Sequence, residues 1–393
     1  MTSTNAARSS KAKIFSFFSG SGLLDLGFEA ENYRTVYVNE SYGPFLEAYK
    51  YSREKLNIEE PEYGYYDGSI TDFQDPQQNS QFRDLLLDAR RDGSFIGFIG
   101  GPPCPDFSVG GKNRGRHGDR GKLSGTYISL ICEHQPDFFL FENVRGLWQT
   151  KVHRHFYEEL KNLLRGVGYA LTERLTNSIE YGAPQDRDRI ILLGFRDPDL
   201  KKNVDAFPWL DHALFPNRSA FAYDWPRISP FKEQSELPPP PTIPIELTVQ
   251  YWFDKNDVTN HPNAEHCFRP KAGLARFRSV SEGDDSKKSF KRLHRWRYSP
   301  TAAYGNNEVH LHPYKPRRIS VAEALAIQSL PPNFTLPPGM TLSNMFKTVG
   351  NGVPYLAAKM LARSLKTFMK NYYEPNSIQH RQSHRAASAQ KSL

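Results

Sequence analysis

Strand and helix signals alternate along the first half of this 393-residue chain, and the alternation restricts the possible folds more than any other feature. Apolar or β-branched runs typical of strands lie at residues 13–20, 33–40, 94–101, 137–144, 169–178 and 189–196. Stretches with the apolar spacing of helices lie between them, at residues 22–31, 43–55, 81–91, 123–135 and 152–168. Because parallel strands need a crossover connection, usually a helix, this order predicts an α/β fold: a mixed, mostly parallel sheet with helices on both faces.

The character of the sequence changes after residue 196. The chain becomes rich in proline, asparagine and aromatic residues and loses its periodicity, as in ELPPPPTIPIEL. Helical spacing later resumes, with Ser320 as the expected N-cap and Glu323 at the capping-box position. The expected divisions are a disordered N-terminus at 1–11, an α/β domain at 12–196, a smaller irregular domain at 197–316, a helical segment returning to the α/β domain at 317–372, and a disordered tail at 373–393.

Basic residues outnumber acidic residues by 51 to 43, which gives a formal net charge of +8. Their distribution is more informative. Between Arg269 and Arg297, ten lysines and arginines face three acidic residues, and phenylalanine and tryptophan are interleaved with them. The pattern predicts contact with the phosphates of a polyanion, and a solvated loop with a chance bias of charge is the alternative. The candidate contact residues in this stretch are Arg276, Arg278, Arg295 and Arg297.

Several classes of protein are not indicated. The three cysteines, Cys104, Cys132 and Cys267, are widely spaced, and no Cys/His cluster has the spacing of a zinc site. We therefore expect neither a disulfide framework nor a metal site. No apolar stretch approaches the roughly 18 residues of a membrane-spanning helix, and the N-terminus lacks the apolar segment of a secretory signal. We expect a cytoplasmic protein with no membrane partner.

The segment FFSGSGLLDLGF is predicted to be a strand, a glycine turn and the start of a helix. Glycine lets a ligand approach the backbone, and the helix N-terminus offers free amides. The dinucleotide fingerprint requires a glycine at the position of Asp25, so a pyrophosphate is not indicated. Glu40 ends the next strand, where an acid can bind both hydroxyls of a ribose. Together these features favour a nucleoside cofactor such as S-adenosylmethionine, and a tight turn without a ligand is the alternative.

Cys104 lies in GGPPCPDFSVGG, between two prolines and just after a predicted strand. Most free cysteines are buried and inert. A nucleophilic thiolate instead needs exposure and a positive environment, and the basic segment GGKNRGRHGDRGK follows directly. Ligands bind at the carboxyl ends of parallel strands, and the glycine turn, Glu40, Cys104 and Glu142 are all expected there.

Glu142 follows four apolar residues in FLFENV. A carboxyl group in that place can work on a ring nitrogen as an acid, and a helix N-terminal acid is the alternative. In APQDRDRIILLG, the residues Gln185, Arg187 and Arg189 alternate along the chain, so we expect their side chains on one face of a strand. Because apolar residues follow, the strand is expected to be buried, and its polar side chains then need anionic or carbonyl partners.

Six segments, in this order, resemble the cytosine carbon-5 DNA methyltransferase family of bacteria: FFSGSG, GGPPCPDFS, FENV, YGAPQDRDR, RRISVAEALAIQSLP and FKTVGNGVP. The resemblance covers most of the chain. It implies the Rossmann-like fold of methyltransferases that depend on S-adenosylmethionine, with S-adenosylhomocysteine as the product, and it makes residues 197–316 the target-recognition domain.

The resemblance also implies roles for matching positions. Cys104 is the implied nucleophile and Glu142 the partner of the ring nitrogen, while Arg187 and Arg189 hold the nucleophile loop and the base carbonyl. The implied cofactor-binding residues are Phe18, Gly20, Gly22, Leu23, Glu40, Ser69, Ile70, Pro102, Asn351 and Val353. Besides the basic candidates named above, the residues expected to contact DNA are Ser108 and Gln185.

Three positions depart from the family pattern. Ser69 replaces the usual aspartate that contacts adenine, Pro105 replaces a glutamine, and Ala326 replaces an arginine. The first departure bears on cofactor affinity, and the second removes a backbone amide beside the implied nucleophile. None of the three removes a catalytic group.

We therefore predict a DNA (cytosine-5-)-methyltransferase that methylates a flipped cytosine in double-stranded DNA through a covalent Cys104 adduct. A monomer is expected, with a cognate restriction endonuclease as a functional rather than a physical partner. Three alternatives remain: a tRNA cytosine-5 methyltransferase, a non-catalytic DNA-binding regulator on the same scaffold, and a nicotinamide oxidoreductase. The size and charge of 197–316 argue against the first, the retained polar groups such as Glu142 against the second, and the missing third glycine against the last.

Overall fold

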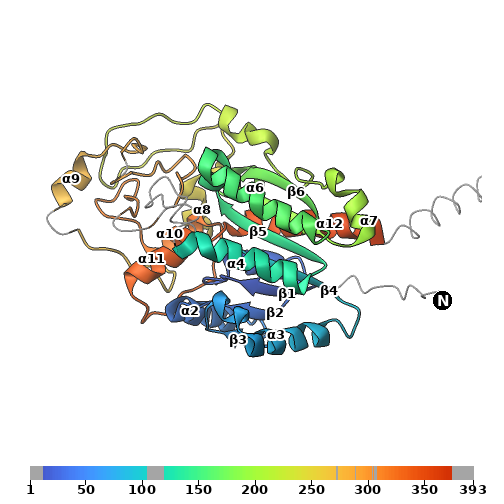
Figure 1. The fold of residues 1–393 in the computed structure, drawn as a ribbon. Coiled ribbons are helices and arrows are strands. Elements are labelled where there is room, and N and C mark those ends of the chain that lie inside the picture. The colour runs from blue at the N-terminus through green and yellow to red at the C-terminus, as the bar shows by residue number, and fades with distance from the viewer. Residues whose placement is uncertain are drawn as a thin grey trace, which may run out of the picture.

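The computed structural model describes residues 12–103, 119–270, 273–287, 289–302, 304 and 308–373. They contain a seven-stranded sheet in the order β3-β2-β1-β4-β5-β7-β6 (Figure 1). The strands are β1 (Ala12–Phe17), β2 (Arg34–Asn39), β3 (Tyr65–Tyr66), β4 (Phe95–Gly100), β5 (Phe138–Val144), β6 (Ala170–Asn177) and β7 (Asp188–Phe195). Only β7 runs antiparallel to its two neighbours, β5 and β6, so the predicted mixed, mostly parallel sheet is confirmed.

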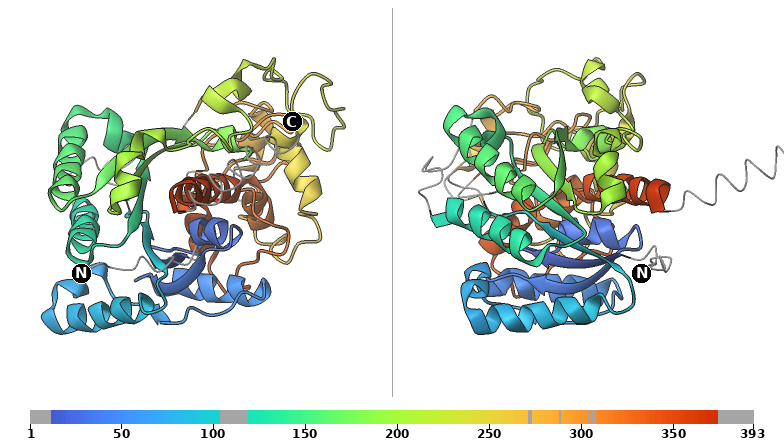
Figure 2. Two further views of the ribbon diagram at one scale, coloured as in Figure 1. Left: turned by 90° about the vertical axis from the view of Figure 1, so that its right-hand side faces the viewer. Right: turned by 45° about the vertical axis from the view of Figure 1, so that its right-hand side comes forward.

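Helices cover both faces of this sheet, as the alternation of signals predicts (Figures 1 and 2). The helices of one face are α3 (Pro76–Ala89), α4 (Asp119–His134) and α6 (Lys151–Gly166), and those of the other are α1 (Leu23–Glu29) and α12 (Tyr355–Tyr373). Helix α2 (Gly43–Lys55) packs at the β2–β3 edge. A Cβ on Gly27 in α1 would lie 2.4 Å from the Cβ of Ala358 in α12, so this glycine allows the first and last helices to pack in close contact.

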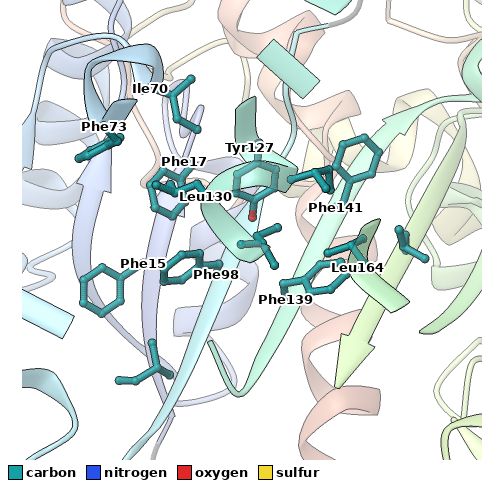
Figure 3. Close-up of a cluster of buried hydrophobic side chains, with 14 of the residues drawn as sticks. Phe15, Phe17, Ile70, Phe73, Phe98, Tyr127, Leu130, Phe139, Phe141 and Leu164 are labelled. Atoms are coloured by element: carbon teal, nitrogen blue, oxygen red, sulfur yellow. The ribbon is translucent and has the colours of Figure 1, made fainter. Parts of the chain in front are cut away.

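The apolar runs of the strands fill two cores, one on each face of the sheet. Along β5, Phe139 and Phe141 point into the core beneath α4 and α6 (Figure 3). Phe138 and Leu140 belong to the core beneath α1 and α12. Each fully buried side chain of this size contributes about 1.5–3 kcal/mol to stability. Burial on both faces explains why these strands are almost uninterrupted apolar runs.

The chain beyond β7 is mostly irregular, as predicted. Its short helical elements are α7 (Pro198–Lys202), η4 (Val204–Ala206), η5 (Pro216–Ala222), η6 (Ile245–Leu247), α8 (Val249–Lys255) and α9 (Leu274–Ser279). The described residues of this region pair as strands only in isolated bridges, such as Ser229 with Glu282. Leu200, Val204 and Phe207 still pack in the core of the sheet, so its packing continues past residue 196.

Helical structure resumes at α10 (Val321–Ile327) and α11 (Leu342–Asn351), and continues into α12. The predicted capping box of α10 is confirmed: the Ser320 hydroxyl accepts from the Glu323 amide over 3.2 Å, and the Glu323 carboxylate accepts from the Ser320 amide over 2.7 Å. Some short elements are not predicted from the sequence, namely β3, α11, α5 (Arg145–Gln149), η1 (Ile70–Gln74) and η3 (Ser178–Tyr181).

Candidate active site

The carboxyl end of β5 places Glu142 beside Arg189. The pairing of β5 with β7 sets Val144 opposite Arg189, which brings the guanidinium alongside the carboxylate two residues earlier. Arg189 Nε lies 2.7 Å from Glu142 Oε1, in a close ion pair without the alignment of a hydrogen bond. Glu142 is 8% exposed. The sequence singles out both residues and predicts an anionic or carbonyl partner for Arg189, and Glu142 is the anionic partner that the structure shows.

Gly101 is a site residue that the sequence analysis did not single out. A Cβ at this position would lie 2.7 Å from Glu142 Oε2, so only glycine lets the carboxylate approach the chain here. The Asn143 side chain, 2% exposed, donates from Nδ2 to Pro102 O over 3.4 Å. These two contacts place the segment that leads into Cys104 directly against the Glu142 strand. Cys104 lies outside the described residues.

Arg187 is buried just behind this pair, at 1% exposure. Its Nη1 donates to Ala302 O over 3.3 Å, and its Nη2 donates to Gly350 O over 2.9 Å and to Asn351 O over 3.4 Å. Burial, and then the like charge of Arg189, lowers the pKa of the Arg187 guanidinium well below its ordinary value. The carbonyl partners that the sequence predicts for a buried arginine are therefore present, and they come from two distant segments of the chain.

Gln185 is fully buried and links the same segments. Its Oε1 accepts from Ala302 N over 3.1 Å, and its Nε2 donates to Gln328 Oε1 over 3.2 Å. Gln328 Nε2 in turn donates to Val349 O. The expectation that Gln185 contacts DNA is corrected here. Its side-chain amide is buried and hydrogen-bonds to other groups of the protein, so it connects two segments of the chain.

The glycine turn after β1 carries three left-handed residues: Phe18 (φ 53°), Gly20 (φ 58°) and Gly22 (φ 79°). Glu40, at the end of β2, accepts from the Gly20 amide over 2.9 Å and from the Tyr42 amide over 2.8 Å. Burial raises the pKa of the Glu40 carboxyl, although these two backbone amides act in the opposite direction. The predicted turn and acid are therefore adjacent, and Glu40 has a fixed position.

The C-terminal segment completes this end of the sheet. Thr348 Oγ1 donates to Ser21 Oγ over 3.0 Å, and a Cβ on Gly352 would lie 2.4 Å from Leu23 Cδ2. Asn351 and Val353 flank that glycine, so the structure brings the two predicted groups of cofactor residues together from opposite ends of the chain. Leu23 itself is 2% exposed and packs in a core cluster with α10 and α11.

Comparison with known proteins decides the family. A family model described as C-5 cytosine-specific DNA methylase matches residues 12–367. The chain belongs to this family.

Relatives of this methylase agree with the assignment. The Type II methyltransferase M.NmeDI of Neisseria meningitidis serogroup C is 57% identical over 367 residues, which are 93% of this chain and 86% of the relative. The Type II methyltransferase M.MthTI of Methanothermobacter thermautotrophicus is 28% identical over 90% of this chain and 96% of its own. The predicted activity, DNA (cytosine-5-)-methyltransferase, is thereby confirmed.

Solved structures show the same fold. An Escherichia coli protein described as a putative DNA modification methyltransferase encoded within a prophage has a TM-score of 0.63 at 22% identity, over 92% of this chain and all of the other. Spodoptera frugiperda DNMT2, in a mutant form, has a TM-score of 0.56 at 15% identity, over 91% of this chain and all of the other. None of the described helices of the methylase is long and apolar enough to cross a bilayer.

The turn that contains Ser69 follows β3 and is tied to β2. Asn39 donates from Nδ2 to Gly68 O over 2.9 Å and to Tyr66 O over 3.1 Å. Ser69 Oγ accepts from the Thr71 amide over 3.2 Å and from the Thr71 hydroxyl over 2.7 Å. Ser69 thus caps the short helix η1 with its hydroxyl, at the position where the family usually has an aspartate carboxylate. The neighbouring Ile70 is 2% exposed and packs in the core.

The basic candidates for DNA contact separate into two groups. Arg276 and Arg278 are exposed on α9, and Arg297 is half-buried with its Nε unpartnered among the described residues. Arg295 is a correction: it is 4% exposed and forms a two-bond ion pair with Glu282, so its charge is already neutralised inside the protein. Ser108 lies outside the described residues.

Proposed function

We propose that this methylase transfers a methyl group to carbon 5 of a cytosine that has left a DNA duplex, through a transient bond between the Cys104 sulfur and carbon 6. One observation carries the proposal. The Glu142–Arg189 ion pair lies at the carboxyl end of β5, against Gly101 and Pro102, which lead directly into Cys104. The Glu142 carboxyl group, the Arg189 guanidinium and the backbone segment that leads into Cys104 therefore lie together at one edge of the sheet.

The chemistry gives each group a role. Carbon 5 of cytosine is too weak a nucleophile to attack a methyl donor. Addition of the Cys104 thiolate to carbon 6 raises the electron density at carbon 5. Glu142 stabilises the adduct by donating a proton or a strong hydrogen bond to ring nitrogen 3. Carbon 5 then receives the methyl group, a base removes its proton, and elimination returns the thiolate. Arg189 orients Glu142 and binds the base carbonyl, and Arg187 fixes the backbone around them.

The residues at the glycine turn fit S-adenosylmethionine, which when bound supplies an electrophilic methyl group. Glu40 is a buried carboxylate whose oxygens each accept one backbone amide and retain capacity for ribose hydroxyls. Gly20 and Gly22 adopt the left-handed backbone conformation that the turn requires. Asn351 and Val353 approach from the C-terminal segment. Phe18, Ser69, Ile70 and Pro102 remain the proposed lining of this site.

We further propose that residues 197–316 recognise the target, with Arg276, Arg278 and Arg297 as the DNA-contact residues, and that 317–372 return the chain to the catalytic domain. Relatives described as Type II methyltransferases support a role in restriction–modification with a cognate endonuclease that acts on the same sequence. The proposed enzyme acts as a monomer in the bacterial cytoplasm, where its DNA is.

Replacement of the nucleophile tests the mechanism. Cys104→Ser should abolish tritium transfer from labelled S-adenosylmethionine to duplex DNA while leaving DNA binding intact, and it should form no adduct with a duplex that contains 5-fluorocytosine. Cys267→Ser, at a half-buried thiol outside the site, is the matched control and should remain active. Bisulfite sequencing of DNA from a host that expresses the chain supplies the target for the duplex. Undiminished transfer by Cys104→Ser, or transfer to tRNA in place of duplex DNA, would refute the proposal.

A further inference from the structure

A buried ionisable cluster lies against the glycine turn, on α1 and α2. Arg53 is 2% exposed; its Nη2 donates to Gly22 O over 2.7 Å, and its Nε lies 3.0 Å from Glu29 Oε2. A Cβ on Gly22 would lie 2.6 Å from Tyr49 Cε2 and 2.7 Å from Arg53 Nη2. Helix α2 therefore packs in direct contact with the turn, and the Arg53 charge lies directly at the turn.

Asp25 is the second carboxylate of the cluster, at 1% exposure. Its Oδ1 accepts from Ser16 Oγ over 2.8 Å, and the Tyr49 hydroxyl also acts on the carboxyl and lowers its pKa. The groups that face it are Arg53 and Tyr49 from α2, Glu29 from its own helix and Ser16 from β1. When Asp25 and Glu29 are both ionised, two negative charges oppose one positive charge, and one negative charge is left uncompensated.

Such a charge is costly away from water unless a cation lies nearby. Burial raises the pKa of Asp25 to about 6, although the Arg53 charge acts in the opposite direction. Asp25 therefore passes from neutral to ionised between mildly acidic and neutral pH. The methyl donor proposed for the other side of the turn carries a positive sulfonium, whereas the product S-adenosylhomocysteine carries a neutral thioether.

Resting on the proposed function, we propose that ionised Asp25 is a positioning residue whose negative charge makes the cofactor site prefer the cationic methyl donor over the neutral product. It acts across the glycine turn, in surroundings where charges are weakly screened, and not by contact with the cofactor. Two consequences follow from linkage. Binding of the donor releases a proton from Asp25, and loss of the sulfonium charge after transfer weakens the hold on the product.

The test measures affinities for S-adenosylmethionine and S-adenosylhomocysteine by calorimetry, with the full chain and no DNA. In the wild type, the preference for the donor should rise by about 3- to 15-fold between about pH 5 and about pH 7, as expected for one charge at an intermediate dielectric. Glu40 is retained in Asp25→Asn, so the difference between the two proteins isolates the contribution of Asp25. Asp25→Asn should show a lower ratio at neutral pH and a weaker dependence of the ratio on pH than the wild type. Titrations in two buffers of different ionisation enthalpy should detect proton release in the wild type only.

Glu31→Gln is the matched control, because Glu31 belongs to the same part of the chain but pairs with Arg363 over 2.7 Å, away from the turn. It should keep the wild-type pH dependence. A ratio independent of pH in the wild type, or a wild-type pH dependence in folded Asp25→Asn, would refute this inference and leave the proposed function intact. Failure of the wild type to bind either ligand at any pH would instead refute the proposed cofactor, and this inference with it. The wild-type measurements decide the question even if Asp25→Asn does not fold.

Discussion

The sheet and the irregular region beyond it fill their interiors with different groups. In the sheet, Phe15, Phe98 and Phe139 are fully buried and pack among other aromatic rings (Figure 3). In the irregular region, the largest fully buried side chain is that of Arg292, which hydrogen-bonds to backbone carbonyls while the Glu282 carboxylate acts on it only from a distance. The core of the sheet is hydrocarbon that repeats with the period of a strand, whereas the irregular region combines apolar residues such as Trp252 and Phe253 with fully buried polar groups.

Arg292 shows what these polar groups do. Its Nε donates to Val280 O over 2.8 Å, and its Nη1 and Nη2 donate to the carbonyls of Lys315, His312 and Phe277. A backbone without strands or helices leaves carbonyls that have no ladder partner, and each one buried without a hydrogen bond costs about 1–3 kcal/mol. Burial lowers the pKa of Arg292 to about 10, so it remains charged at neutral pH.

The comparison teaches that the two regions tolerate change differently. A hydrocarbon core distributes its stabilisation over many similar contacts, so loss of a single methyl group costs only about 0.5–1.5 kcal/mol. A polar core concentrates its stabilisation in a few groups, and removal of one partner leaves the other buried and unpaired.

The largest effect is expected from breaking a buried ion pair of the irregular region. Glu282, 3% exposed, accepts from Arg295 Nε and Nη2, both over 2.9 Å. Glu282→Ala leaves the guanidinium without its counter-charge and should lower the free energy of unfolding by about 3–5 kcal/mol. Ile191→Val in β7 should cost only about 0.5–1.5 kcal/mol. Urea denaturation followed by circular dichroism and tryptophan fluorescence measures both.

Two further variants separate charge from packing. The double variant Glu282→Leu/Arg295→Met removes both charges and should recover most of the loss. Glu233→Ala removes the carboxylate partner of the exposed Arg278 and should cost less than about 1 kcal/mol. If Glu282→Ala lowers the free energy of unfolding no more than Ile191→Val does, the two regions do not differ in the way inferred here.

At the carboxyl edge of the sheet, even a small substitution should have a large effect on activity. Gly101→Ala places a methyl group 2.7 Å from Glu142 Oε2, so the carboxylate or the chain toward Cys104 has to move. We expect kcat to fall by about 100-fold with little change in stability, because a displacement of about 1 Å at the reacting groups is enough for such a loss. Single-turnover methyl transfer measures the effect. Gly125→Ala in α4, where a Cβ meets none of the described residues within 4 Å, is the control and should keep full activity. Equal activity of both variants would contradict the proposed role of Gly101.

The sequence predicts the regular sheet and its helices better than it predicts the irregular region. The strands and most of the long helices are predicted because a period of two or of 3.6 residues shows which face is buried. Glu142 and Arg189 are each predicted as buried polar residues for the same reason, namely the apolar run before Glu142 and the alternation at Arg189, whereas their pairing with each other is seen only in the structure. The edge itself is expected because ligands bind at the carboxyl ends of parallel strands.

The remaining features depend on partners that no periodic pattern reveals. Gln185 is buried because Gln328, 143 positions away, meets its amide. Arg295 is a basic residue among basic residues in the sequence, and only its contact with Glu282 shows that it is internal. The close approach of Gly101 to Glu142 likewise arises when two strands are side by side. The glycine pair before Pro102 was the available signal for it.

The smallest effect is expected at Arg278, which lies in the same basic stretch as Arg295 but on the surface. Arg278 is exposed and pairs with Glu233 over 3.1 Å, so Arg278→Gln should change the free energy of unfolding by no more than about 0.5 kcal/mol. If Arg278 binds a phosphate, the variant should reduce the slope of log affinity for duplex DNA against log salt by about one. Arg91→Gln, at an exposed arginine before β4 and thus at the amino edge of the sheet, is the matched control and should leave the slope unchanged. An unchanged slope in Arg278→Gln would remove this residue from the DNA surface. A reduced slope would show that, within one run of basic residues, the surface members bind the substrate and the buried members hold the region together.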